Sequence, residues 1–336
     1  MAAAMNVFLQ SDQFPEVSRG AVVAIGNFDG LHRGHQQLLG IARDHAKAHN
    51  RPWGILTFEP HPRTFFRPAE PVFRLTPHPL KMRLVSAFGA DFAASVEFND
   101  AFANLTADEF IVSQLVERLG VSHVITGYDF HFGKGRKGGP ENLRELGAKY
   151  GFGVTVVDQV TDDGDGHAPF SSSSIRTSLR RGHLRAAANE LGYQWIVMGE
   201  VVPGDQRGRT IGFPTANIIL DPGAEPFRGI YAVTARDAAS PPQTLSWQGA
   251  AYFGDRPTFD TKRTFLEVYL LDQTIDLYGK TLMVNFVDLI RPDKTFKGVD
   301  ELVTQMHADC AEVRKVLASD GVESFPLRVL QSQGKI

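Results

Sequence analysis

The chain has 336 residues, of which 43% are hydrophobic and 22% charged, an ordinary globular balance that excludes wholesale disorder. Its 35 basic and 38 acidic side chains give a formal net charge of −3, which excludes a broad basic surface for non-specific nucleic-acid binding. The single cysteine, Cys310, excludes an intrachain disulfide and a cysteine-based zinc cluster. At about 150 residues per domain, this length predicts two domains.

The N-terminal segment has neither the basic residues nor the unbroken apolar stretch of a secretory signal, because polar residues interrupt it at positions 10–12. No stretch reaches the roughly 18 apolar residues of a membrane span. We therefore expect a cytoplasmic protein without a membrane partner. Either Met1 or Met5 could be its start.

The first half of the chain alternates strand patterns with amphipathic helix patterns. Strands are expected at residues 21–25, 53–58, 122–126 and 154–157, and helices from residue 35 and at residues 81–88, 107–119 and 141–150. Short continuous apolar runs are typical of strands that are covered on both faces. The alternation predicts a doubly wound α/β domain over residues 1–184.

In the second half, short strands follow one another between Gly, Pro and Asp turns. They are expected at residues 196–202, 230–235, 246–251, 264–271 and 281–290. Closely spaced strands of this kind predict a small antiparallel barrel in a second domain, residues 185–336. A closing helix capped by Asp300 is expected next, with one apolar face formed by Leu302, Met306, Val313 and Leu317.

The first expected strand leads into a glycine-rich segment, Gly26-Asn27-Phe28-Asp29-Gly30-Leu31-His32-Arg33-Gly34-His35. In doubly wound sheets ligands bind at the carboxyl ends of the strands, where a helix N-terminus favours anions. Glycines let the backbone approach a phosphate closely, and His32 and His35 can donate to one phosphoryl group. Because the motif is short, an ordinary turn with two surface histidines is the alternative.

Two more segments are expected at the same edge of the sheet. Gly127–Gly133 follows a predicted strand and contains Asp129. The serine-rich Ser171–Arg176 opens a helix and offers hydroxyl caps, free backbone N–H groups and an arginine to a polyphosphate. A simple helix cap is the alternative for these serines.

The second half opens with a segment rich in glycine and arginine. Arg207, Gly208 and Arg209, which follow Gly204, are expected to form a flexible cationic loop suited to phosphates. Thr215 and Asn217 are two residues apart, so their oxygens point to the same side of an extended segment. Neutral oxygens together with nucleotide phosphates are ligands that Mg²⁺ commonly accepts. Without this context, Pro-Thr-Ala-Asn would be interpreted as a turn.

Both halves resemble one known family. The stretches GNFDGLHRGHQ, TFEPHP, GYDFHFG and SSSSIR are similar to the HxGH nucleotidyltransferases, specifically to the adenylyltransferase half of bacterial bifunctional FAD synthetases. The run G-x-x-x-G-R-x-x-G-F-P-T-A-N, at residues 204–217, resembles the riboflavin kinase signature, and the resemblance continues through Arg256–Phe259, Glu267 and Arg291. Ser173 stands where the family usually has threonine, and Pro203 where a histidine or another polar residue is frequent.

The resemblance implies a Rossmann-like nucleotidyltransferase domain followed by a small antiparallel Greek-key β-barrel of the riboflavin kinase type, with a C-terminal helix. It implies that the chain phosphorylates riboflavin to FMN with ATP and then adenylylates FMN with a second ATP, giving FAD and pyrophosphate. The implied catalytic residues are Glu267, as the base of the kinase, and His32, His35 and Arg176. Those implied for the metal are Thr215 and Asn217, and those for the flavin are Asp129 and Arg291. ATP and phosphate contacts are implied for Gly26, Asn27, Phe28, Gly34, Ser172, Ser173, Gly204, Arg207, Gly208 and Arg209.

Other classes of protein are weighed against this hypothesis. An enzyme with one inactive half, or a flavin-responsive regulatory or RNA-binding protein on the same scaffold, stays open. A class I aminoacyl-tRNA synthetase is disfavoured because residues 81–84 depart from its KMSKS loop. A dinucleotide-dependent oxidoreductase is disfavoured because no GxGxxG motif follows the first strand, and a Walker A site is disfavoured because Thr274 stands where its first glycine should be. The near-neutral charge disfavours nucleic acid, so the expected partners are small-molecule substrates, with a homo-oligomer left open.

Overall fold

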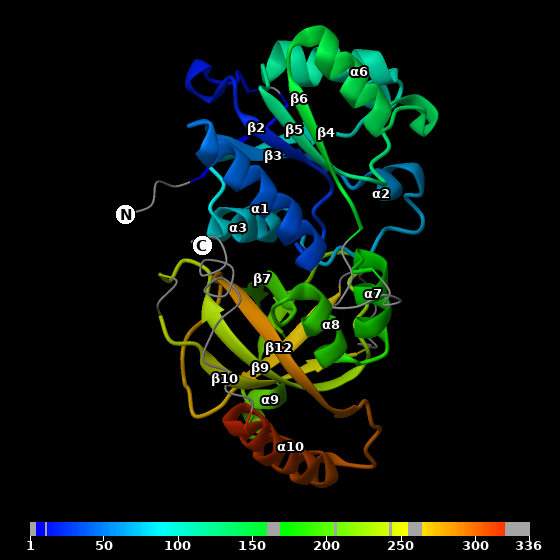
Figure 1. Ribbon diagram of the computed structural model, residues 1–336. Helices are drawn as coiled ribbons and strands as arrows, with labels where there is room; N and C mark the ends of the chain where they lie inside the picture. Colours follow the sequence, from blue (N-terminus) through cyan, green and yellow to red (C-terminus); the bar gives the residue numbers. More distant parts are fainter. Residues whose placement is uncertain are drawn as a thin grey trace. The chain divides into compact units, whose positions relative to one another are not determined.

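A computed structural model describes residues 5–10, 12–159, 169–204, 207–241, 244–254 and 264–319. The described chain forms two compact units. The first comprises the residues up to 72 and residues 81–170, and the second comprises the segment 73–80 and the residues from 171 onward. The first unit contains a parallel sheet with helices and the second a closed barrel (Figure 1), which confirms the predicted fold class.

The first unit is built on a six-stranded parallel sheet in the order β1-β4-β3-β2-β5-β6. Its strands are β1 (Asn6–Phe8), β2 (Val22–Ile25), β3 (Trp53–Glu59), β4 (Phe92–Glu97), β5 (His123–Gly127) and β6 (Gly153–Val157). Strands β2 and β3 are buried along almost their whole length, which explains their continuous apolar runs. Strands β1 and β4, which were not predicted, extend one edge of the sheet.

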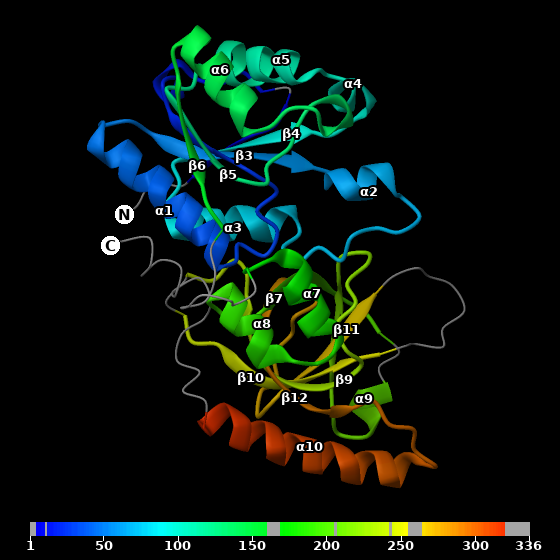
Figure 2. The same ribbon diagram turned by 45° about the vertical axis from the view of Figure 1, so that its right-hand side comes forward.

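Helices cover both faces of this sheet, with α1 on one face and α6 on the other (Figures 1 and 2). The helical segments are α1 (Arg33–Ala48), α2 (Pro62–Phe66), α3 (His78–Phe88), α4 (Asp100–Ala103), α5 (Ala107–Phe110) and α6 (Pro140–Tyr150), with the shorter or irregular η1 (Glu16–Ser18), η2 (Ile111–Arg118) and η3 (Lys134–Arg136). The single helix predicted over residues 107–119 is α5 continued by the π-helix η2. A capping box of Thr106 and Glu109 starts it.

The strand order of the sheet reverses at β2. From β2 the chain builds outward through β3 and β4, and it then returns to place β5 on the other side of β2. At such a switch point the connections diverge and leave a crevice at the carboxyl ends of the two strands. Because Ile25 pairs with Thr126, the loops that follow β2 and β5 leave the sheet side by side.

A stack of three imidazoles joins the end of α1 to the start of β5. The ring centroids of His45 and His49 lie 4.3 Å apart, and those of His45 and His123 lie 3.9 Å apart. The Nε2 atom of His123 is hydrogen-bonded with the hydroxyl of Thr155 at 2.8 Å. Burial and the neighbouring imidazoles lower the pKa of His123 to about 4 and also lower the pKa of His45.

This stack makes stability depend on acidity. We expect the free energy of unfolding to fall as the pH is lowered from 6.5 to about 4, because the unfolded chain binds a proton on His123 throughout this interval and the folded chain does not. His123→Gln should weaken this dependence, whereas replacement of the exposed His183 should leave it unchanged. Thermal midpoints measured across the interval test this; an equally steep dependence in His123→Gln would contradict it.

The second unit is a closed six-stranded antiparallel barrel in the order β10-β11-β8-β7-β12-β9. Its strands are β7 (Ile196–Val202), β8 (Ala216–Ile219), β9 (Gly229–Asp237), β10 (Trp247–Phe253), β11 (Phe265–Leu270) and β12 (Thr281–Pro292). The five predicted strands are confirmed, and the unpredicted β8 completes the closure. Trp195, Tyr231 and Phe286 pack against one another in the interior, with ring centroids 4.7 and 5.0 Å apart.

The helices of this unit are α7 (Ser172–Arg180), α8 (Leu184–Leu191), α9 (Arg207–Thr210) and α10 (Val299–Ser319). The long helix α10 lies against the barrel (Figure 2), where Val313 and Leu317 pack with residues of β9 and β12. Its predicted cap is wrong. The helix begins at Val299, because the amide of Leu302 already donates to the carbonyl of Gly298 at 3.2 Å, so Asp300 lies in the first turn.

Candidate active sites

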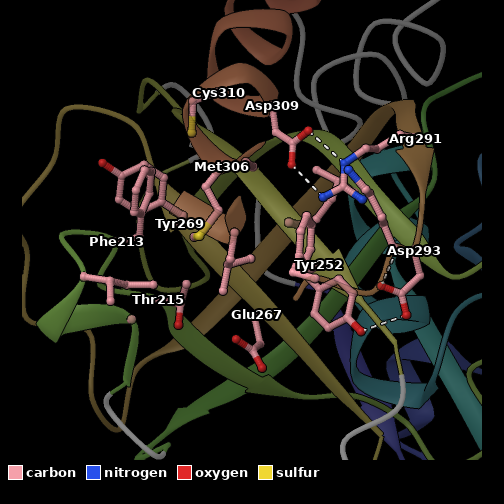
Figure 3. A pocket seen from close by; sticks show the side chains of 18 residues that line it. Phe213, Thr215, Tyr252, Glu267, Tyr269, Arg291, Asp293, Met306, Asp309 and Cys310 are labelled. Carbon is pink, nitrogen blue, oxygen red and sulfur yellow. Dashed lines mark hydrogen bonds and ion pairs between the residues drawn. The ribbon is translucent and has the colours of Figure 1, made fainter. Parts of the chain in front are cut away.

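A cavity of about 370 Å³ is lined by residues of the barrel and of α10 (Figure 3). Ligand pockets in proteins range from roughly 300 to 1,000 Å³, so it can hold a small organic molecule. The barrel contributes a polar end with Gly208, Thr215 and Glu267. One face of α10 forms another wall, with Leu302, Met306, Asp309 and Cys310 at helical spacing.

Glu267 enters this cavity from β11. The strand register pairs it with Asn217 of β8 on one side and with Tyr252 of β10 on the other. Residues that are directly opposite in an antiparallel pair point to the same face, so these three side chains leave the same face of the barrel. Glu267 therefore faces a cavity, which the alternation of a strand alone could not establish.

The predicted metal residues lie beside Glu267. Thr215 lines the cavity, and the amide of the buried Asn217 packs so closely on Gly204 that a Cβ atom there would collide with it. At Gly208, a Cβ atom would lie 3.6 Å from the Thr215 hydroxyl. A hydroxyl and an amide carbonyl supply neutral oxygen donors, which suit Mg²⁺ and not the soft metals.

That donor set is incomplete on its own. Among the described residues, no group of three or more His, Cys, Asp or Glu side chains could hold a metal ion. A cation beside Thr215 and Asn217 would therefore take its remaining ligands from water and from substrate phosphates, as Mg²⁺ commonly does. The residues present fit the predicted ion.

The segment next to this end of the cavity differs from the prediction. Residues 207–210 form the short helix α9, where a flexible loop was expected, and the carbonyl of Gly208 accepts from the amide of Phe213 at 2.8 Å. The side chains of Arg207 and Arg209 lie outside the described part of the structure, as does the predicted family match at residues 256–259.

Charged and polar side chains line the wall of the cavity near Arg291. Arg291 forms a two-pronged ion pair with Asp309 of α10, with Nε–Oδ1 and Nη2–Oδ2 distances of 2.9 and 2.8 Å. The Tyr252 hydroxyl donates to Asp293 at 3.1 Å (Figure 3). Sequence reasoning missed Tyr252, Asp293 and Asp309. An acid within the apolar stripe of the closing helix is a signal that could have identified Asp309.

In the first unit, the loop after β2 brings the two predicted histidines together. His32 stands at the N-cap of α1 and His35 in its first turn, with ring centroids 3.7 Å apart. Phe28 is fully buried with a φ of +49°, and its ring forms a T-shaped pair with that of His35 at a centroid distance of 5.4 Å. Phe28, Asp29, Leu31 and His32 are buried, unlike the side chains of an ordinary surface turn, whereas Arg33 is exposed.

Lys81 and Glu59 add charge to this site, and sequence reasoning had not singled them out as site residues. The Lys81 ammonium is 2.9 Å from the Glu59 carboxylate, and 3.4 Å from the Thr57 hydroxyl, which donates in turn to the carbonyl of Asn27. Burial, followed by the charges of His32 and Lys81, holds the pKa of His35 well below 6.5. His35 is therefore neutral at physiological pH, with one N–H donor and one acceptor.

Two polar atoms at this site point to a ligand. Within the described part of the chain, Asn27 Oδ1 and His35 Nδ1 are buried and have no hydrogen-bond partner. Buried polar atoms are rarely left without a partner, so a bound molecule or water is expected to complete them. Gly26 and Gly34 flank the same turn, and the exposed Asp129 follows β5, the neighbour of β2.

The serine segment belongs to the second unit. Ser171 caps α7, accepting a hydrogen bond from the amide of Ser174 at 3.1 Å, so the predicted cap is confirmed. Arg176 is buried and donates through Nε to the carbonyl of Phe73 at 2.6 Å. The convergence of Ser172, Ser173 and Arg176 on the histidines of the first unit stays a prediction.

The family models define the class of this chain, a transferase with two catalytic domains: one described as FAD synthetase matches residues 14–173, and one described as riboflavin kinase matches residues 191–317. The predicted domain boundary after residue 184 stays a prediction.

Similarity to known proteins identifies the particular family. The bifunctional riboflavin kinase/FMN adenylyltransferase of Escherichia coli K12 is 39% identical over 290 residues, which cover 86% of this chain and 90% of the relative. The protein of that name from Bacillus subtilis 168 is 35% identical over 298 residues, covering 87% and 91%. The chain belongs to the family of bifunctional riboflavin kinases/FMN adenylyltransferases.

A solved structure described as a macrolide-efflux protein from Streptococcus pneumoniae is also similar, with a TM-score of 0.78 and 30% identity. The match covers 92% of this chain and 99% of that one. In the part of this chain that the structure describes, no helix is both long and apolar enough to cross a membrane.

Proposed function

We propose that the barrel phosphorylates riboflavin to FMN and that the α/β unit adenylylates FMN to FAD, each step using one ATP. Membership of the family supports this pair of activities. The observation that carries the assignment of the kinase site is a single cavity lined by Glu267, Thr215 and Gly208. We further propose a cytoplasmic location and small-molecule substrates, without a nucleic-acid partner.

In the proposed kinase step, the 5′-hydroxyl oxygen of riboflavin forms a bond to the γ-phosphorus of ATP while the bond to ADP breaks. An alcohol is a weak nucleophile, so Glu267 accepts its proton. Thr215 and Asn217 would hold Mg²⁺, which would neutralise charge on the phosphate oxygens. The backbone at Gly204 and Gly208, and the arginines of α9, are proposed to contact the phosphates.

In the proposed adenylyl step, a phosphate oxygen of FMN forms a bond to the α-phosphorus of ATP and pyrophosphate leaves. The nucleophile is already an anion, so this step needs position and charge stabilisation and no general base. The His32 and His35 N–H groups donate to the reacting phosphoryl. The buried ion pair of Lys81 with Glu59 holds the ammonium near His35.

Other predicted residues complete this second site in the proposal. Gly26, Asn27, Phe28 and Gly34 are assigned to the nucleotide, and Asp129 to the flavin. Ser172, Ser173 and Arg176 are assigned to the departing phosphates.

The experiment that tests the function is incubation of the purified chain with riboflavin, ATP and Mg²⁺, followed by chromatography of the flavins over time. FMN should appear first and FAD afterwards, and supplied FMN should give FAD without a lag. Accumulation of FMN alone would show a single activity. Flavin binding without turnover would instead favour the regulatory protein.

Thr215→Val tests the proposed cation ligand. This change removes one oxygen and keeps the shape of the side chain, so we expect the Mg²⁺ concentration for half-maximal kinase activity to rise about tenfold, which corresponds to about 1.4 kcal/mol. The Mg²⁺ requirement of FAD formation from supplied FMN should stay the same. An unaltered Mg²⁺ requirement of the kinase step would remove Thr215 from the ligand set.

A further inference from the structure

Asp309 is a buried carboxylate in the cavity wall for which the proposed kinase step has no use. Its side chain is 5% exposed. It accepts hydrogen bonds from Nε and Nη2 of Arg291, at 2.9 and 2.8 Å, and from Nε2 of Gln305 at 2.9 Å. A charge so completely paired and enclosed holds its partner in one orientation.

Three further observations show that Arg291, the ion-pair partner of Asp309, is held in place. Its Nη1 atom donates to the carbonyl of Pro292 at 2.9 Å, its guanidinium lies 5.7 Å from the centre of the Phe296 ring, and its side chain is 18% exposed. A guanidinium has five N–H donors. The three donors just named are used within the described chain, so two N–H groups remain for a molecule in the cavity that Arg291 lines.

We propose that Asp309 is a positioning residue for flavin recognition, acting through Arg291. It orients the guanidinium so that the remaining N–H groups meet a carbonyl oxygen of the flavin ring, and it cancels the arginine charge so that the wall suits an uncharged ring. This inference rests on the proposed kinase function. Asp309 itself touches neither the flavin nor the reacting atoms.

The alternative role, attaching α10 to the barrel, is served elsewhere. Arg314 of α10 forms a second two-pronged pair with Asp272, at 2.7 and 2.9 Å, but these side chains are 47% and 71% exposed and do not line the cavity. Val313 and Leu317 bury the helix against the barrel. The Asp272–Arg314 pair is therefore a matched control: the same chemistry on the same helix, away from the ligand.

The test compares kinase kinetics of Asp309→Asn and Asp272→Asn in the full chain. In Asp309→Asn we expect KM for riboflavin to rise about tenfold or more, with kcat within about twofold, because binding is lost and the transition-state contacts of the phosphoryl end are kept. KM for ATP and FAD formation from supplied FMN should not change. Asp272→Asn should match the wild type in every respect.

Action through Arg291 is tested by a double variant. If Asp309 works only through the arginine, Arg291→Gln with Asp309→Asn should have the same riboflavin KM as Arg291→Gln alone. Additive effects on KM would overturn the proposal, and so would a wild-type riboflavin KM in Asp309→Asn.

Two further results distinguish a failure of this inference from a failure of the variant to fold and from a failure of the proposed function. If Asp309→Asn does not fold, Arg291→Lys, which keeps the charge but loses the two-pronged geometry, should raise riboflavin KM in the same way. A folded Arg291→Lys with the wild-type KM would overturn the inference. A wild-type chain that forms no FMN would instead refute the proposed function.

Discussion

Glu267→Gln is expected to lower the rate of FMN formation from riboflavin by roughly 10²- to 10⁴-fold, which is the usual contribution of a positioned general base. The substitution keeps the size of the side chain and its place in the cavity but removes the group that accepts the hydroxyl proton. FAD formation from supplied FMN should survive, because it takes place in the other unit and its nucleophile needs no base. Both activities are measured by chromatography of the flavins.

A matched control for this variant is Glu200→Gln. Glu200 is an exposed acid on β7 of the same barrel and does not line the cavity. The Glu200→Gln variant should keep both activities. Kinase activity undiminished in Glu267→Gln would remove this carboxylate from the mechanism.

His32→Ala should lower adenylyl transfer by roughly 10²- to 10³-fold, the usual cost of removing one donor to a charged transition state. His35→Ala should do the same. The kinase step should stay intact, since these histidines belong to the first unit. Because the pKa of His35 is held well below 6.5, a rise in pH from 6.5 to about 8 removes no proton from it and should not lower adenylyl transfer through this residue.

The control for these variants is His49→Ala, at the other end of helix α1, where the side chain is exposed. It should keep full adenylyl transfer. Equal loss of both activities in a well-folded His32→Ala would argue against two independent sites.

Strand and helix patterns identified most elements of both units, because the hydrophobic periodicity of a buried strand or an amphipathic helix is a local property of its own sequence. Two of the three strands that were not predicted are short: β1 has three residues and β8 has four. Strand β4 is buried along most of its length but contains small residues, Ala93 and Ala94, that give little strand signal. The π-helix after α5 has the same apolar spacing as an ordinary helix over so short a run.

The chemistry of the first site was readable in the chain itself. Gly26 to His35 are contiguous because one strand end and one helix start form the whole turn, so their order in sequence is also their order in space. The same holds for Thr215 and Asn217, which flank the start of one strand.

Only the tertiary structure decided which distant residues meet. Glu267 reaches the cavity because β11 pairs with β8 and β10 in a particular register, and Arg291 meets Asp309 because α10 folds back on β12. Lys81 meets Glu59 across the packing of α3 on the sheet. Local periodicity records which face of an element is buried but not which neighbour it is buried against; register and helix packing, which involve the whole chain, supply that choice.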